Sequence, residues 1–295
     1  MPRFEVRHIA TSHAGSRIAV AAFERLVVTW DIMTGDHICN LETCLDFGGD
    51  RLAISEDGRL LAAASFRMKH VVAYSATDGS EIWKRDNLGA IQRLAFDPLT
   101  GDLLVGAEGR PTYRLRSLSG ETVKEYRGVR ALTPSPYQLG LESHETRKRI
   151  RVHFAGQPTA DMSIDMESLA VLSTAFTPDH ILVSESAGAV RCFDLHDGKL
   201  CWRHDPPQGF HALRIAYCES SDYVACLLWH YETGREKQIV MLDARTGRVR
   251  QSADLEGTPV VAEFALKGCA LITSGGMVYT VKGRSEIIAS KCFSF

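Results

Sequence analysis

A short turn that ends in glycine recurs along the chain and restricts how it can fold. Two copies, ending at Gly156 and Gly283, are weak; five are regular and span residues 31–35, 75–79, 116–120, 194–198 and 243–247. From Gly35 to Gly283 the seven glycines lie about 41 residues apart on average. A connection between antiparallel strands needs a residue with positive φ, which glycine adopts at least cost. The Asp or Ser that opens most copies can accept hydrogen bonds from the backbone that follows.

Between successive turns the chain has four short runs rich in Val, Ile, Leu, Ala and aromatic residues, as packed strands are. A period of about 40–45 residues built from four short strands is the signature of a β-propeller. We therefore predict an all-β fold, a seven-bladed β-propeller with four antiparallel strands per blade, in a single domain over residues 1–295. The predicted blades cover roughly 3–43, 48–87, 90–128, 129–166, 169–206, 211–255 and 259–293. Whether residues 3–7 help to close the ring stays open.

Dipeptides at the ends of the third runs resemble a known repeat. Trp30-Asp31 resembles the tryptophan–aspartate dipeptide of WD-repeat propellers, and Phe193-Asp194 and Leu242-Asp243 are looser versions of it. The Gly-His pair that opens a WD repeat is missing from this sequence. The resemblance implies the propeller fold.

The fourth runs carry a second resemblance. Segments 79–83 and 198–202 are similar to the Asp-x-x-x-Gly-x-x-x-Trp repeats of quinoprotein-like propellers, in which the tryptophan docks between blades. This resemblance implies a docking role for Trp83 and Trp202, and Cys39, Lys124 and Gln251 stand at the same position in other repeats. Quinoprotein dehydrogenases bind calcium and a quinone. A shared fold does not transfer that activity, so we expect no cofactor.

Composition narrows the classes of function. The chain has 295 residues, 45% of them hydrophobic and 24% charged, and a net charge of −2, which are ordinary values for a globular protein. Residues 1–8 have no apolar signal core and no run is long enough for a membrane helix. The eight cysteines form no CxxC pair, so we expect them to be reduced, with a disulfide framework the weaker alternative. These features favour a cytoplasmic protein outside the membrane.

A basic cluster lies in the fourth predicted blade. It consists of Arg147, Lys148, Arg149 and Arg151, and it belongs to a segment that is positive within an otherwise acidic chain. Concentrated positive charge can steer an acidic partner, although a solvated loop would show the same residues. Nucleic acid is a weaker alternative, because stacking aromatics are sparse around the cluster.

Metal ligation and catalysis leave weaker signals. His196, His204 and His211 lie near Cys192 and Cys201, and Cys218, Cys226 and His230 form another loose group, but neither has the paired spacing of zinc sites. The sequence has no Gly-x-Ser-x-Gly elbow, Walker loop or dinucleotide fingerprint. We therefore expect buried thiols rather than a metal site, and no catalytic residues.

The longest repeat contains Trp229 and Tyr231 near a hairpin turn. Trp and Tyr dominate interface hot spots, so these residues suggest a recognition element; the alternative is that Trp229 packs on a neighbouring blade. We expect a non-enzymatic protein-binding propeller, either a scaffold subunit or an inhibitor or immunity-type protein that blocks its partner. The expected partner is another protein, for which an acidic surface would suit the basic cluster. A hydrolase or lyase with its site at the central channel and nucleic-acid binding through the basic edge remain as alternatives.

Overall fold

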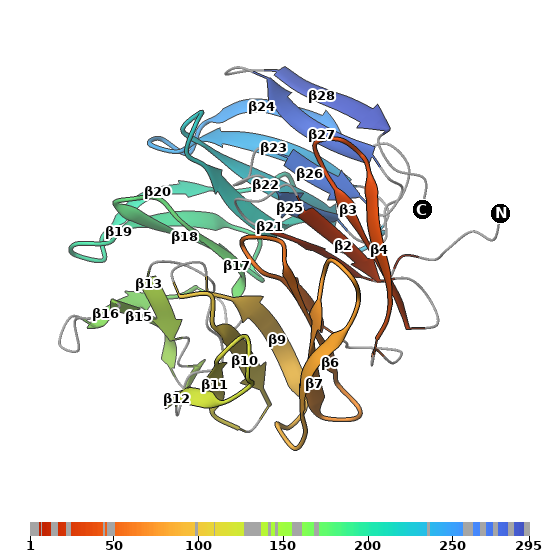
Figure 1. The fold of residues 1–295 in the computed structure, drawn as a ribbon. Helices are drawn as coiled ribbons and strands as arrows, with labels where there is room; N and C mark the ends of the chain where they lie inside the picture. The colour runs from red at the N-terminus through yellow and green to blue at the C-terminus, as the bar shows by residue number, and fades with distance from the viewer. Residues whose placement is uncertain are drawn as a thin grey trace. The chain divides into compact units, whose positions relative to one another are not determined.

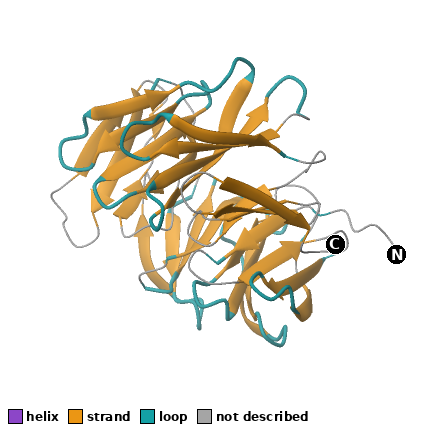
Figure 2. Ribbon diagram, turned by 90° about the horizontal axis from the view of Figure 1, so that it is seen from above, coloured by secondary structure: helices purple, strands orange, loops and turns teal. Residues whose placement is uncertain are grey.

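The computed structural model describes residues 6, 8–12, 17–21, 25–43, 45, 51–97, 100–108, 110–126, 137–140, 143–144, 147–154, 161–167, 171–234, 237–255, 262–265, 270–273, 277–282 and 286–291. The chain divides into two compact units. Unit 1 comprises residues 1–142, 153–158 and 295, and unit 2 comprises residues 143–152 and 159–294. The described residues form strands, turns and loops without helices (Figure 2). Among them, no helical segment meets the length and apolarity needed to cross a membrane.

Unit 1 contains the first three sheets, each with four antiparallel strands in chain order. The first sheet contains β1 (His8–Thr11), β2 (Arg17–Ala21), β3 (Leu26–Asp31) and β4 (His37–Glu42). The second contains β5 (Arg51–Ile54), β6 (Leu60–Ser65), β7 (His70–Ser75) and β8 (Glu81–Arg85). The third contains β9 (Ile91–Phe96), β10 (Leu103–Ala107), β11 (Thr112–Leu115) and β12 (Thr122–Tyr126). The fourth sheet contains β13 (Tyr137–Gly140), β14 (Ser143–His144), β15 (Arg147–Phe154) and β16 (Asp161–Asp165).

Unit 2 contains the last three sheets, which repeat the same arrangement (Figure 1). The fifth sheet contains β17 (Val171–Phe176), β18 (His180–Glu185), β19 (Val190–Asp194) and β20 (Leu200–His204). The sixth contains β21 (Phe210–Cys218), β22 (Tyr223–His230), β23 (Lys237–Asp243) and β24 (Val249–Asp254). The seventh contains β25 (Ala262–Ala265), β26 (Ala270–Thr273), β27 (Met277–Lys282) and β28 (Glu286–Lys291). The seven four-stranded sheets of the described residues match the seven predicted blades, with β21 beginning one residue before the predicted start of the sixth, so the predicted fold class is confirmed. The single domain stays a prediction.

The predicted glycine turns have the expected backbone. Gly35, Gly79, Gly120, Gly198 and Gly247 all have φ between 67° and 78°. Asp31, Asp194 and Asp243 each accept hydrogen bonds from the backbone N–H groups two and three residues later, as Asx turns require. Gly156 and Gly283 lie outside the described residues.

The outer strands β4, β8, β12, β20 and β24 each contain a β-bulge. In β8 and β20 the residue after the bulge is a tryptophan that contacts the next sheet. Trp202 follows the bulge of β20, and its indole Nε1 donates to the carbonyl of Ala244 at 2.9 Å. A Cβ built on Gly247 would come within 2.5 Å of the Trp202 ring, so this turn tolerates only glycine. In unit 1, Trp83 makes the same contact with Ser117 and Gly120. The docking role that the resemblance implied for both tryptophans is confirmed.

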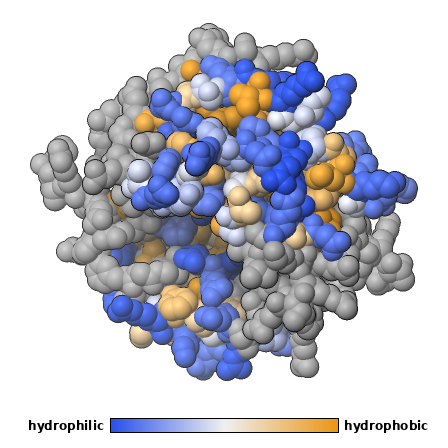
Figure 3. Space-filling model, turned by 180° about the vertical axis from the view of Figure 1, so that it is seen from behind, coloured by the Kyte–Doolittle hydropathy of each residue, from blue (hydrophilic) through white to orange (hydrophobic). Residues whose placement is uncertain are grey.

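Apolar side chains pack between neighbouring sheets rather than on one central layer. In unit 1 one cluster joins the first two sheets and another joins the second and third. In unit 2 one cluster joins the fifth and sixth sheets and another joins the sixth and seventh. On the face shown in Figure 3, the apolar groups are small and lie among hydrophilic ones. Most side chains inside the described blades therefore serve packing, and side chains that can meet a macromolecular partner lie mainly at strand ends and turns.

The Trp202 contact predicts unequal costs for two glycine substitutions. Gly101→Ala carries only the backbone strain of a left-handed residue, about 1–2 kcal/mol, because its φ is 71° and no atom lies within 4 Å of the new methyl group. Gly247→Ala adds overpacking against Trp202 to the same strain, about 1–3 kcal/mol more. Denaturant midpoints measured for both variants test this. Equal destabilisation would mean that Trp202 does not restrain the turn.

Candidate functional site

The two aromatic residues predicted for recognition lie at one end of the sixth sheet, in different settings. Trp229 belongs to the strand ladder, where it pairs with His211 of β21 and Lys237 of β23. Tyr231 is the first residue of the turn after β22, and 57% of it is exposed. Of the two, Tyr231 presents the more accessible side chain to a partner.

Trp229 is half-buried and contributes mainly to local packing. The ammonium of Lys237 lies 4.7 Å from the centre of its ring, and Lys237 is itself buried, with its pKa lowered by burial. A Cβ built on Gly234 would lie 3.5 Å from the indole Nε1, so the turn closes over the other side of the ring. The Trp229 side chain thus supports the turn that carries Tyr231.

Tyr231 is held by contacts on both its backbone and its ring. Its N–H donates to the carbonyl of Gly209 at 2.8 Å. Its ring lies 4.9 Å from the ring of His211 and stacks 5.9 Å from that of His230, which also meets Phe210 edge-on at 5.0 Å. Phe210, His211, His230 and Tyr231 are called the aromatic cluster below. The cluster fixes an exposed tyrosine in one position.

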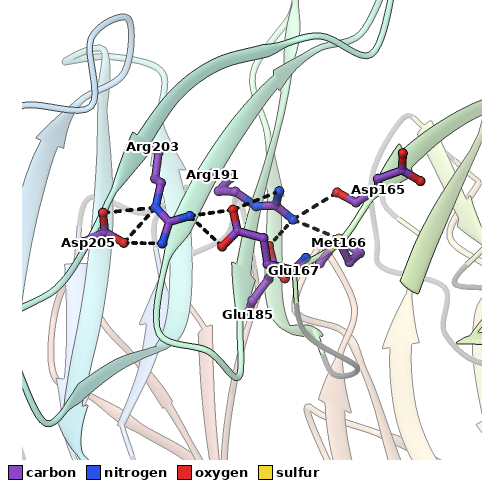
Figure 4. A network of polar contacts seen from close by, with 7 residues as sticks. All are labelled: Asp165, Met166, Glu167, Glu185, Arg191, Arg203 and Asp205. Atoms are coloured by element: carbon purple, nitrogen blue, oxygen red, sulfur yellow. Dashed lines mark hydrogen bonds and ion pairs between the residues drawn. The ribbon is translucent and has the colours of Figure 1, made fainter. Parts of the chain in front are cut away.

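An alternating chain of charges lies at the corresponding end of the fifth sheet (Figure 4). Glu185 is fully buried and pairs with Arg191, which is also buried; Arg191 in turn lies 3.6 Å from the carboxylate of Glu167. Arg203 reaches both oxygens of Glu167 at 2.5 Å and contacts Asp205 at 2.7 Å. Glu185, Arg191, Glu167, Arg203 and Asp205 form the charged chain.

The charged chain runs from the interior of unit 2 to its surface. The side chains of Glu167, Arg203 and Asp205 are 41%, 40% and 65% exposed, respectively. Asp205 and then Glu167 raise the pKa of Arg203, and Arg203 lowers the pKa of Asp205. At the buried end, Arg191 also donates to the carbonyl of Asp165 at 3.1 Å, and Glu185 accepts the N–H of Glu167 at 2.8 Å. The network therefore attaches the segment before the fifth sheet to that sheet.

The aromatic cluster and the charged chain are neighbours on unit 2. The turn between β18 and β19 contains Gly188, and a Cβ built there would lie 3.3 Å from the carbonyl of Phe210 and 3.8 Å from Nδ1 of His211. Glu185 and Arg191, the buried end of the charged chain, flank this turn, so the turn connects the charged chain with the aromatic cluster. Sequence reasoning missed the charged chain, because Glu167, which links its two ends, lies 18 to 36 residues away from its partners. The one signal available in the sequence was that the apolar runs of β18 and β19 include the charged residues Glu185 and Arg191.

The basic cluster lies on a strand rather than in a loop. Arg147, Lys148, Arg149 and Arg151 belong to β15, which pairs with β14 through Ser143↔Lys148 and also pairs with β13 and β16. The side chains of this strand lie outside the described residues. The role of the basic cluster stays a prediction.

The structure groups the possible metal ligands differently from the sequence analysis. Cys192 and Cys201 lie together, but their third neighbour is His180. His196 is an exposed turn residue, and His204 ends β20, where burial lowers its pKa. Cys226 is buried and pairs with Ile215 of β21. Cys218 lies three residues after Ile215 on the same strand, so Cys226 and Cys218 are not paired. Sequence spacing missed His180, because the register of β18 against β19 places it there.

The expectation that every cysteine is reduced is wrong for Cys218. This residue, buried at the end of β21, is disulfide-bonded, and the other half of the bond lies outside the described residues. A bond between distant segments follows strand pairing, which cysteine spacing alone does not reveal. Cys39, Cys192, Cys201 and Cys226 are free.

Comparisons with known proteins agree with the geometry. A family model described as "Outer membrane protein assembly factor BamB" matches residues 186–291. No curated protein matches the chain. Two solved structures each give a TM-score of 0.69 at 14% identity: U3-55K, covering 98% of this chain and 95% of that one, and the RRP9 WD40 repeats, covering 92% and 88%. The C-terminal WD40 domain of Sif2 gives 0.66 at 11% identity and covers 93% of each chain. The chain has a β-propeller fold that resembles WD40 propellers, with quinoprotein-like repeats in its C-terminal part.

The gradient of burial along the charged chain predicts unequal costs for removing its two arginines. Arg191→Met leaves the fully buried Glu185 without its cation and should destabilise unit 2 by about 3–5 kcal/mol. Arg203→Met removes a partly exposed arginine and should cost less than about 1 kcal/mol. Thermal and denaturant unfolding compare the two variants. A mild effect of Arg191→Met would show that Glu185 finds other compensation.

Proposed function

We propose that the chain is a non-enzymatic, protein-binding β-propeller whose partner docks on the aromatic cluster and the exposed part of the charged chain. The proposal rests above all on Tyr231, which is 57% exposed although its backbone and ring are both held in place. WD40-like propellers commonly bind proteins, which fits this reading. Within this function, the chain acts as a scaffold subunit or as an inhibitor or immunity-type protein.

A fixed, exposed tyrosine suits an interface hot spot. Tyrosine offers a large apolar body and a hydroxyl that can donate or accept a hydrogen bond. The aromatic cluster already restrains its ring, so binding would lose little additional side-chain entropy. A partner that presents an apolar pocket with a polar edge would match this side chain.

The exposed charges would give the interface its orientation. Glu167 and Asp205 flank Arg203, so the exposed part of the charged chain presents a negative–positive–negative order. Complementary charges on a partner would select the docking angle and raise the association rate. Because these groups lie at the solvent edge, their contribution should weaken at high salt.

Photo-crosslinking tests this surface directly. With a photoreactive amino acid in place of Tyr231 in the full-length chain, we expect a crosslinked protein partner in the native host. The same amino acid at Leu118, a 71%-exposed turn residue of the third sheet, is the matched control and should give no such product. Crosslinking to the same protein at both positions, or at neither, would contradict the proposed surface.

Affinity for the crosslinked partner provides the quantitative test. Tyr231→Ala should weaken binding by about 30-fold or more, the size expected for a hot spot of about 2 kcal/mol. Its melting temperature should change little, because the side chain is mostly exposed. Leu118→Ala should retain full affinity. An unchanged affinity for Tyr231→Ala would remove the tyrosine from the interface.

The basic cluster offers an independent test of an acidic partner. Replacing Arg147, Lys148, Arg149 and Arg151 with Glu should slow association if this strand steers the partner, and the loss should shrink as salt increases. Surface-binding kinetics at low and physiological salt measure this. Unchanged association at both salt concentrations would exclude the cluster from recognition, and binding of the wild-type chain to a random duplex would favour nucleic acid instead.

A further inference from the structure

Three possible metal ligands come together on the fifth sheet, apart from the proposed binding surface. His180 begins β18, Cys192 lies within β19 and Cys201 lies on β20. One donor atom of each residue lies within 4.8 Å of the others. We propose that these three residues bind a zinc ion, with an open fourth position for water. This inference does not rest on the proposed protein-binding function.

Strand register brings the three donors to one side of the sheet. His180 pairs with Asp194, and Cys192 lies two residues before Asp194 on β19, so His180 and Cys192 are diagonal neighbours on one face. On the other side of β19, Cys192 pairs with Trp202 and Phe193 pairs with Leu200. Cys201 is therefore the extra residue of a β-bulge. A bulge changes the direction of its side chain, which here contacts the Cys192 thiol.

The same positions in other blades show that the fold does not require these residues. The equivalent trios, in the order of His180, Cys192 and Cys201, are Arg17, Thr29 and Ile38; Leu60, Ala73 and Ile82; Asp102, Arg114 and Val123; and Tyr223, Met241 and Arg250. They form apolar contacts or ion pairs, such as the one between Arg114 and Asp102 at 2.7 Å. Among these described blades, the fifth alone carries one imidazole and two thiols at the three positions.

The donor set and the spacing suit zinc. Zinc binds thiolate sulfur and imidazole nitrogen in tetrahedral sites, where neighbouring ligand atoms are about 3.5–3.8 Å apart. The present separations of up to 4.8 Å require only small side-chain rotations to reach this geometry. Cys201 is exposed, whereas Cys192 is fully buried, so an ion can enter from solvent on the Cys201 side. Three protein ligands leave one coordination position, which water can occupy.

A hydroxyl group behind the histidine would orient it. Oγ1 of Thr177 lies 3.2 Å from Nδ1 of His180, and it also accepts the N–H groups of Asp179 and His180. This contact leaves Nε2 as the ring nitrogen for the ion. A group that holds the second nitrogen of a metal-ligating histidine typically affects affinity by about 10–100-fold. Thr177 is thus a positioning residue in the proposed site.

Zinc binding would release two protons, one from each thiol. Burial raises the pKa of both thiols above the usual range; the neighbouring Cys201 and then the charge of Asp194 act in the same direction on Cys192, and Asp194 does so on Cys201. Both are therefore protonated at neutral pH in the absence of metal. Formation of two zinc–sulfur bonds releases one proton from each thiol, and the neutral imidazole contributes its free electron pair. Affinity should then rise by about 100-fold per pH unit below the thiol pKa values.

Cobalt and zinc titrations of the full-length chain test the site. With a phosphine reductant present, Co²⁺ should produce thiolate-to-metal charge-transfer absorption, which Zn²⁺ should abolish. Cys201→Ser removes a ligand, so it should weaken zinc binding at least as much as the loss of an orienting group does, about 10–100-fold. It should also reduce the number of protons released on zinc binding from two to one. His180→Asn should weaken binding similarly but retain the two-proton dependence. Thr177→Val should weaken it by about 10–100-fold with the spectrum preserved.

Cysteines elsewhere provide matched controls. Cys39→Ser and Cys226→Ser change free thiols of other sheets and should keep zinc affinity and the two-proton dependence. Zinc should raise the melting temperature of the wild type and of these controls, and at the same zinc concentration it should raise that of Cys201→Ser less. Absence of the charge-transfer band in reduced protein would overturn the proposal. Zinc binding that survives both Cys201→Ser and His180→Asn would place the metal elsewhere and overturn it as well.

Discussion

The contact between an outer strand and the turn of the next sheet holds neighbouring blades together within each unit. No ladder of hydrogen bonds joins the described sheets, so each blade depends on side-chain packing against its neighbour. Trp202 buries its ring against Gly247 and satisfies its indole nitrogen at Ala244. Trp83 repeats this contact in unit 1. The spacing of bulge, tryptophan and glycine therefore sets both the period of the sequence and the alignment of adjacent sheets.

This packing determines where charged and recognition residues can lie. The middle strands of the regular blades are almost fully buried, so polar groups there need internal partners. Glu185 and Arg191 satisfy that requirement by pairing at the ends of their strands and by extending the network outward through Glu167. Tyr231 lies in an exposed turn, so its hydroxyl group does not need a partner inside the protein. Its position is instead fixed by rings on strands that the core already holds.

Local features of this fold could be predicted from the sequence, and features that depend on register could not. The glycine turns, the four-stranded repeats and the docking of Trp83 and Trp202 follow from residues close together in the chain. Glu167 joins the charged chain through residues 18 to 36 positions away, so no linear motif reveals the whole network. Likewise, spacing grouped Cys192 and Cys201 with His196, His204 and His211, whereas pairing of β18 with β19 selects His180. The disulfide at Cys218 was missed for the same reason.

In β8 and β20 the bulge of the outer strand places two different kinds of position side by side: a tryptophan that docks on the next sheet, and a bulged residue that is exposed. The residue after the bulge is tryptophan in two of the described blades, and in both it reaches the next sheet. The bulged residue is Ile38, Ile82, Val123, Cys201 or Arg250. Ile38 packs against the cluster between the first two sheets, whereas Ile82, Val123 and Cys201 are exposed. Substitution at an exposed bulged position should therefore leave the blade contact intact. A repeat fold can therefore acquire a donor such as Cys201 in one blade without altering the packing that defines the others.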